Sequence, residues 1–208
     1  MVGASVLAVG GLAAWSVQQP TIGFTATHCG VAGTGKRRLL VAYGSQYGTT
    51  GEVADAIGKV YCEAGHAVDV VRIQDDPDPS AYDAVVIGAP VHSDAWLKDA
   101  VTYAGDHHTA LAGMPVAYFL TCMTLGMSQQ PEARQRIAGV FTPVRDALPD
   151  VQPIDTGLFA GMLDFSRMSF ATQLLYCAFA ENSTEGDYRD WAAIRNWATS
   201  IQPQLTAG

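Results

Sequence analysis

The chain has 208 residues, of which 49% are apolar, so it is long enough to bury one full hydrophobic core. Its 20 acidic and 12 basic side chains give a formal net charge of −8. This charge opposes binding to nucleic acid, because a phosphate backbone needs clustered lysine and arginine. An acidic surface could attract basic patches on redox partners, although solubility alone explains the same charge.

The first residues form an uncharged, apolar run. Residues 1–17 read MVGASVLAVGGLAAWSV, close to the lower length limit for a helix that spans hydrocarbon. The first basic residues, Lys36, Arg37 and Arg38, follow this run. By the positive-inside tendency, they predict an uncleaved membrane anchor with the domain on the cytoplasmic side. A cleaved signal and a core helix are the alternatives.

A linker and one α/β domain are predicted after the anchor. Residues 18–35 are rich in Gly, Thr and Ala without periodicity, which predicts a linker and leaves residues 36–208 as the domain. Short β-branched runs then alternate with helix-length amphipathic stretches, a pattern typical of a doubly wound parallel sheet covered on both faces. The five predicted strands are 38–43, 67–73, 84–88, 114–121 and 151–159. The predicted helices are 49–64, 95–103, 130–148 and 187–201.

One stretch of the domain carries no clear pattern. Residues 161–186 are too irregular for an element to be predicted, although residues 165–179 are markedly apolar. The apolar part could be a helix, or a surface that meets lipid or a partner protein.

The cysteines show no metal-binding or redox motif. Cys29, Cys62, Cys122 and Cys177 lie far apart, with no C-x-x-C pair and no His at metal-ligand spacing. We therefore expect reduced, mostly buried thiols and no metal centre.

The segment GSQYGTT, residues 44–50, joins the first predicted strand directly to the first predicted helix. The backbone N–H groups of such a turn converge with the helix N-terminus and form an anion site. Ser45, Thr49 and Thr50 add hydroxyl donors, and Gly48 permits a positive φ. The loop has no Lys or Arg, so a phosphate would be held by dipoles alone. The motifs for ATP, GTP and dinucleotides are absent, and by its residues alone the turn could equally be an ordinary helix N-cap.

Several segments resemble one known family. SQYGTT after a first strand resembles the flavodoxin phosphate loop, T/S-x-x-G-x-T, which holds the terminal phosphate of FMN. YDAVVIGAPVHSDAW, MPVAYFLTCMTL and GDYRDWAAIRNWA resemble flavodoxin-like proteins related to menaquinone-dependent protoporphyrinogen oxidase. The resemblance covers residues 38–198. It implies a flavodoxin-like sheet with strand order 2-1-3-4-5 and FMN as the cofactor.

The resemblance also implies where the flavin lies. In an open α/β sheet, ligands bind beyond the carboxyl ends of the strands, where the winding direction switches. The expected phosphate residues are Ser45, Gln46, Tyr47, Gly48, Thr49 and Thr50. One side of the isoalloxazine ring is expected against Ala89, Pro90, Val91, His92 and Trp96, and the other against Thr121, Cys122, Met123, Thr124 and Gly126. A backbone carbonyl between Ala89 and His92 would accept a hydrogen bond from the reduced flavin N5.

Three of these residues have plainer interpretations. Trp96 could equally be a helix residue packed on the core, His92 an ordinary loop residue, and Cys122 a buried structural thiol. No acid–base pair demands a catalytic assignment, since the flavin would perform the redox chemistry itself.

The resemblance implies an electron carrier or oxidoreductase with a quinone or a redox protein as its partner, and the apolar run of residues 1–17 adds a membrane tether. Quinone-linked protoporphyrinogen oxidation is the leading specific activity. An NAD(P)H:quinone reductase and a non-catalytic binding module without flavin are the alternatives.

Overall fold

The computed structural model describes residues 21–31, 36–128, 130–179 and 184–207. The chain forms two structural units, a larger one of residues 24–161 and 188–208 and a smaller one that includes residues 162–187. The predicted anchor, residues 1–17, lies outside the described residues. Among the helices that are described, none is both long enough and apolar enough to cross a membrane.

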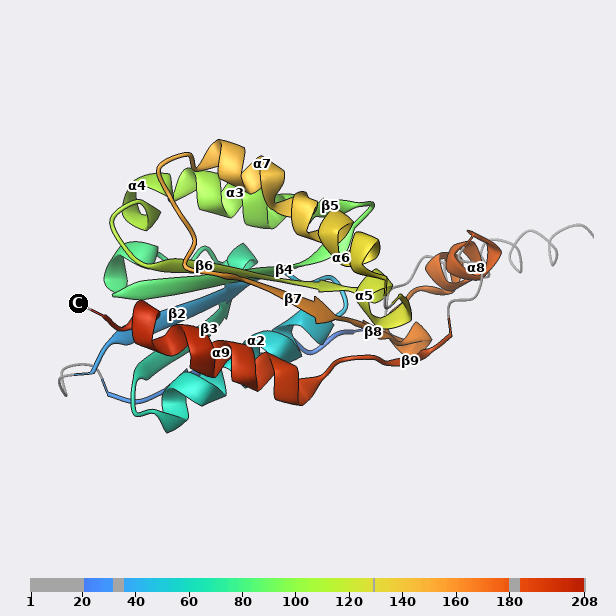
Figure 1. The fold of residues 1–208 in the computed structure, drawn as a ribbon. Coiled ribbons are helices and arrows are strands. Elements are labelled where there is room, and N and C mark those ends of the chain that lie inside the picture. The colour runs from blue at the N-terminus through green and yellow to red at the C-terminus, as the bar shows by residue number, and fades with distance from the viewer. Residues whose placement is uncertain (1–20, 32–35, 129, 180–183, 208) are drawn as a thin grey trace, which may run out of the picture. The chain divides into compact units, whose positions relative to one another are not determined.

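A mostly parallel sheet forms the centre of the larger unit (Figure 1). Its parallel strands lie in the order β3-β2-β4-β6-β7, which confirms the predicted order 2-1-3-4-5 once these strands are counted along the chain. The strands are β2 Arg38–Tyr43, β3 Ala67–Arg72, β4 Ala84–His92, β6 Val116–Cys122 and β7 Thr156–Ala160.

Helices cover both faces of this sheet (Figure 1). One face carries α2 Thr49–Glu63 and α9 Trp191–Leu205. The other carries α3 Lys98–Asp106, α4 His108–Leu111, α6 Pro131–Ala138 and α7 Thr142–Ala147. Successive residues of β2 point to opposite faces, so Leu40 packs with the α3 and α7 side while Val41 packs with the α2 and α9 side. Both faces of the strand are buried, as expected for a central parallel strand.

Three of the predicted helices differ from the structure. The closing helix, predicted over residues 187–201, is α9 Trp191–Leu205, and Asp187 instead belongs to a short strand. The predicted helix over residues 130–148 is divided into α6, a 3-10 turn η3 Gly139–Phe141, and α7. Pro143 is the second residue of α7, where a proline is tolerated because the first N–H groups of a helix have no intrahelical partner. Residues at the start of the predicted helix 95–103 instead form a short strand, β5 Ala95–Trp96.

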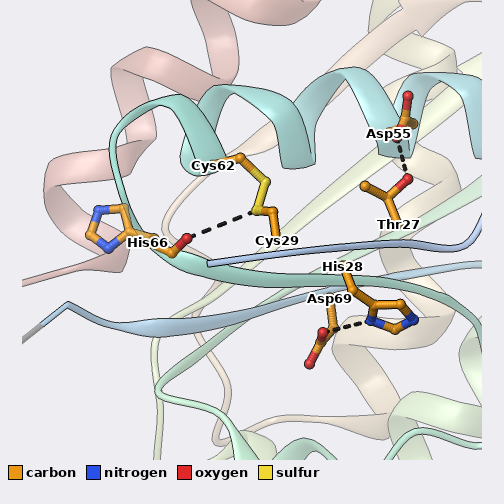
Figure 2. Close-up of a disulfide and its surroundings, with 7 residues drawn as sticks. All are labelled: Thr27, His28, Cys29, Asp55, Cys62, His66 and Asp69. Atoms are coloured by element: carbon orange, nitrogen blue, oxygen red, sulfur yellow. Dashed lines mark hydrogen bonds and ion pairs between the residues drawn. A yellow bond between two sulfur atoms is a disulfide. The ribbon is translucent and has the colours of Figure 1, made fainter. Parts of the chain in front are cut away.

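An additional strand, β1 Thr27–Cys29, lies within the predicted linker and pairs antiparallel with β3 at the edge of the sheet. Figure 2 shows Thr27 and Cys29 directed at α2 and His28 directed at Asp69 on the opposite face. The Thr27 hydroxyl donates to the Asp55 carboxylate at 2.6 Å. The edge of the sheet is therefore covered by a segment for which no strand was predicted.

A disulfide joins Cys29 of β1 to Cys62 in the last turn of α2, with the two Cα atoms 6.0 Å apart (Figure 2). The expectation of reduced thiols is therefore wrong for this pair. Cys122 is free and buried, as expected. The pairing crosses 33 positions of sequence, and folding brings the two residues together because β1 lies beside the helix.

The described residues of the smaller unit include a helix and a short antiparallel pair of strands. Strand β8 Met162–Leu163 pairs antiparallel with β9 Gly186–Asp187, and a 3-10 turn η4 Phe165–Arg167 precedes α8 Phe170–Phe179. Of the two interpretations of the apolar stretch, the helix is observed. The side chains of Phe170 and Leu174 are 51% and 62% exposed, and a contact with lipid or a partner stays a prediction.

Gly88 gives the first testable prediction, because a Cβ atom there would lie 1.9 Å from the Phe119 ring on the neighbouring strand β6. We expect Gly88→Ala to lower the free energy of unfolding by about 2 kcal/mol, the typical cost of overpacking a core. Urea denaturation measures this change. Gly105→Ala is the matched control, since a Cβ in that part of α3 meets no atom within 4 Å, and equal stability of the two variants would contradict the prediction.

Candidate functional site

The first two predicted site segments meet at the carboxyl edge of the sheet, where β2 ends beside Gly88 of β4 and β4 continues to His92. Strand β2 lies between β3 and β4, so the winding direction of the sheet switches between β2 and β4. Directly after β2, the Gly44 N–H donates to the Gly88 carbonyl of β4 at 2.8 Å. The loop after β2 therefore begins beside Gly88, directly before the predicted ring segment of residues 89–92.

The loop after β2 enters α2 through a glycine in the left-handed region. Gly48 is the N-cap residue of α2, with φ 80°, and its helix end has no side-chain cap. Only glycine adopts this conformation without cost. The buried Ser45 hydroxyl accepts the Gly48 N–H at 2.9 Å and closes the turn. Because a hydroxyl can donate while it accepts, Ser45 retains a donor for a ligand.

Several amides of the loop have no protein partner. Within the part of the chain that the structure describes, the backbone N–H groups of Gln46, Thr49 and Thr50 make no hydrogen bond to the protein. The Thr49 and Thr50 groups belong to the first turn of α2, where N–H groups lack intrahelical acceptors and the helix dipole is positive. Such a set of donors suits an anion with several oxygen atoms.

Tyr43 packs against the start of α2, next to this loop. A Cβ atom added to Gly51 would lie 2.7 Å from the Tyr43 ring, so the first turn of α2 packs closely on this ring. The Tyr43 hydroxyl donates to the Thr25 carbonyl at 2.6 Å. Burial raises the pKa of Tyr43, so the hydroxyl keeps its proton and this bond across the neutral range.

Thr50 and Thr121 lie together in the interior. Their hydroxyl oxygens are 2.9 Å apart, and both side chains are buried. The pair ties the N-terminus of α2 to the end of β6. The Thr50 hydroxyl is thus engaged within the protein, while its backbone N–H remains available.

The segment after β4 is a tight hairpin. Strand β4 continues to His92 and pairs antiparallel with β5. Ser93 and Asp94 form the turn with φ of 51° and 57°. Two consecutive positive φ values are typical of the hairpin turn that usually requires Asn or Gly, and side chains in this region cost energy that the surrounding structure must supply. The structure therefore holds His92, which is exposed, on a constrained loop.

Trp96 takes the core position that the sequence left open. Its side chain is 2% exposed, and its ring packs against Tyr118 and Phe141. The indole N–H donates to the Ala89 carbonyl at 3.1 Å, and the Pro90 carbonyl accepts the Leu97 N–H at 3.1 Å. Both carbonyls are thus used by the protein, and the predicted bond from flavin N5 to this segment stays a prediction. A contact between Trp96 and the flavin stays a prediction.

The third predicted segment is a short helix, α5 Met123–Met127, which begins directly after β6. Cys122 is buried at the end of the strand, and the helix side chains Met123 and Thr124 are half-buried. Gly126 approaches the closing segment of the chain, since a Cβ there would lie 2.5 Å from the Tyr188 side chain.

Sequence reasoning missed Arg189, which the fold brings to the loop from the far end of the sequence. Its side chain is 3% exposed, and Nη1 lies 2.8 Å from the Glu52 carboxylate and 3.3 Å from the Thr49 carbonyl oxygen. The guanidinium stacks over the Trp191 ring at 4.4 Å. An arginine inside the otherwise acidic GDYRDW segment was the only signal in the sequence.

A doubly wound parallel sheet with an uncapped helix N-terminus at its switch point is typical of α/β proteins that bind a phosphorylated ligand. Residues 40–187 match the model of the flavodoxin domain family, and the chain belongs to this family. FMN is the cofactor that membership indicates. The free amides and the glycine turn fit its terminal phosphate, which needs several donors and little space.

The relatives agree with this assignment. A Leishmania major protein named protoporphyrinogen IX dehydrogenase (quinone) is 27% identical over 175 residues, covering 79% of this chain and 74% of its own. The Escherichia coli K12 protein of the same name is 24% identical, with 79% and 94% covered. The crystal structure of oxidised flavodoxin 2 from Bacillus cereus has a TM-score of 0.53 at 19% identity, with 80% and 99% covered, and shows the shared fold.

Proposed function

We propose that this chain is an FMN-dependent oxidoreductase that takes electrons from protoporphyrinogen IX and passes them to a quinone. The observation that carries the proposal is the uncapped first turn of α2 at the switch point of the sheet, with free amides at Gln46, Thr49 and Thr50. The names of the Leishmania and Escherichia coli relatives supply the substrate class.

The chain's own residues would bind and orient the cofactor. The amides of the loop hold the phosphate, and the Thr50–Thr121 hydrogen bond keeps the helix N-terminus against β6. The hairpin of β4 and β5, fixed by the Trp96–Ala89 hydrogen bond, borders one side of the ring. When bound, FMN supplies the one- or two-electron chemistry, and the protein sets its orientation and electrostatics.

Membrane tethering through residues 1–17 is part of the proposal, and those residues lie outside the described ranges. The cytoplasmic side of the domain stays a prediction from the sequence. A quinone dissolves in lipid, so a tether would keep the domain near this acceptor. The Cys29–Cys62 disulfide weighs against the cytoplasmic side, because disulfides persist mainly in oxidising compartments. A redox protein is the other partner that the acidic surface would suit.

Purified full-length protein tests the activity directly. We expect its absorbance spectrum and released cofactor to identify FMN, and anaerobic protoporphyrinogen IX to become fluorescent protoporphyrin only when a menaquinone analogue is added. The heat-denatured protein and free FMN are the controls. Steady NAD(P)H consumption without protoporphyrinogen would instead identify a quinone reductase, and a protein that stays colourless after FMN addition would identify a binding module.

A further inference from the structure

The uncapped end of α2 carries an unfavourable charge for a phosphate site. Glu52 is an acidic residue of the first helical turn, and its side chain is 36% exposed. The phosphate of FMN carries between one and two negative charges at neutral pH. Residues 44–50 contain no Lys or Arg. The loop itself therefore has no positive side chain to offset the repulsion between the Glu52 carboxylate and a phosphate at this helix end.

Arg189 lies where it balances this charge. Its guanidinium pairs with the Glu52 carboxylate at 2.8 Å and, through the same Nη1, donates to the Thr49 carbonyl at 3.3 Å. It is almost fully buried, and solvent therefore screens the ion pair less than a surface pair. Stacking on the Trp191 ring restricts the guanidinium further.

The backbone on both sides of Arg189 is anchored, which fixes the direction of its side chain. The Tyr188 N–H donates to the Gly161 carbonyl at 3.2 Å. The Asp190 carboxylate caps α9 by accepting the Ala193 N–H at 2.9 Å. A side chain held in this way has already lost its conformational freedom before a ligand binds.

We propose that Arg189 is a positioning residue that makes the loop selective for a phosphorylated flavin. It neutralises Glu52 and holds the Thr49 carbonyl, so the first turn of α2 presents its amides without a net negative charge beside them. The inference rests on the proposed placement of the FMN phosphate at residues 45–50. A purely structural role would instead support the fold without regard to the ligand's phosphate.

Titration of the full-length apoprotein with FMN and with riboflavin, which lacks the phosphate, separates these roles. We expect Arg189→Gln to weaken FMN binding roughly 10- to 30-fold at low ionic strength, with riboflavin affinity unchanged. The loss shrinks in 0.5 M salt, because added ions screen the repulsion from Glu52. The double variant Glu52→Gln with Arg189→Gln restores FMN affinity to within about threefold of the wild type. Arg189→Lys keeps the charge and retains most of the affinity.

Other results would overturn the inference. Equal losses for FMN and riboflavin, without restoration in the double variant, would assign Arg189 a structural role. If Arg189→Gln does not fold, the double variant and Arg189→Lys are compared with the wild type instead. Because Arg189→Lys keeps the positive charge, a loss of phosphate selectivity in this variant would overturn the electrostatic role. Unchanged FMN affinity in Thr49→Asp would overturn both the phosphate placement and this inference. Weaker FMN binding in Thr49→Asp together with unchanged FMN binding in Arg189→Gln would overturn the inference alone.

Discussion

The Thr49→Asp variant is expected to bind FMN about 100-fold more weakly than the wild-type chain, which corresponds to about 2.7 kcal/mol. Thr49 is the first residue of α2, and its N–H has no protein partner within the described residues. A carboxylate at this position repels the phosphate and also occupies the positive helix end as an internal anion. The fold should be retained, because acidic residues stabilise helix N-termini.

Quenching of flavin fluorescence measures the affinity, and two controls isolate the phosphate. Riboflavin should bind the variant and the wild type equally. Thr142→Asp places the same change at the exposed first residue of α7, on the other face of the sheet, and should leave FMN affinity unchanged (Figure 1). Identical FMN affinities in Thr49→Asp and the wild type would show that the phosphate lies elsewhere.

Removal of the disulfide is expected to have the largest effect on stability. The combined Cys29→Ser and Cys62→Ser variant should lose about 3 to 4 kcal/mol of unfolding free energy, since the bond closes a loop across 33 positions. For a chain of this size the melting temperature should fall by roughly 10 °C. The remaining contacts of β1, such as Thr27 with Asp55, should keep the fold itself intact at room temperature.

A reductant provides the matched control for this prediction. Dithiothreitol should lower the melting temperature of the wild type toward that of the double variant and leave the double variant unchanged. A Cys122→Ala variant should still respond to the reductant, because Cys122 is a free thiol. A wild type that melts at the same temperature with and without reductant would contradict a stabilising role for the bond.

The repetition of strands and helices could be predicted because it depends on local pattern. Arg38–Tyr43 was predicted with its observed bounds, and α2 differs from its prediction by one residue at the end. These elements have strong periodicity, and their loop chemistry supports the same structure. The division of residues 130–148 was missed because the apolar spacing continues across Gly139 and Pro143 while the backbone does not.

The candidate site was predicted less evenly. The loop of residues 44–50 and its position at the switch point follow from sequence order, since the carboxyl ends of parallel strands share one edge. The sequence did not specify whether Trp96 faces the flavin or the core, because this depends on the geometry of the β4–β5 hairpin. In the structure the hairpin places the indole in the core. Individual contacts such as Thr50 with Thr121 depend on register between strands and helices, which local patterns do not specify.

By itself, the sequence determined the fold class and the bounds of its most regular elements, because hydrophobic period and turn chemistry act between near neighbours. The strand order followed from the resemblance to a known family, and the phosphate loop without a cation stays a prediction. Only the tertiary structure decided that β1 closes an edge of the sheet, that Cys29 meets Cys62, and that Arg189 reaches Glu52. Each of these contacts joins residues more than 30 positions apart. Such contacts are set by how complete elements pack, and no short segment encodes them.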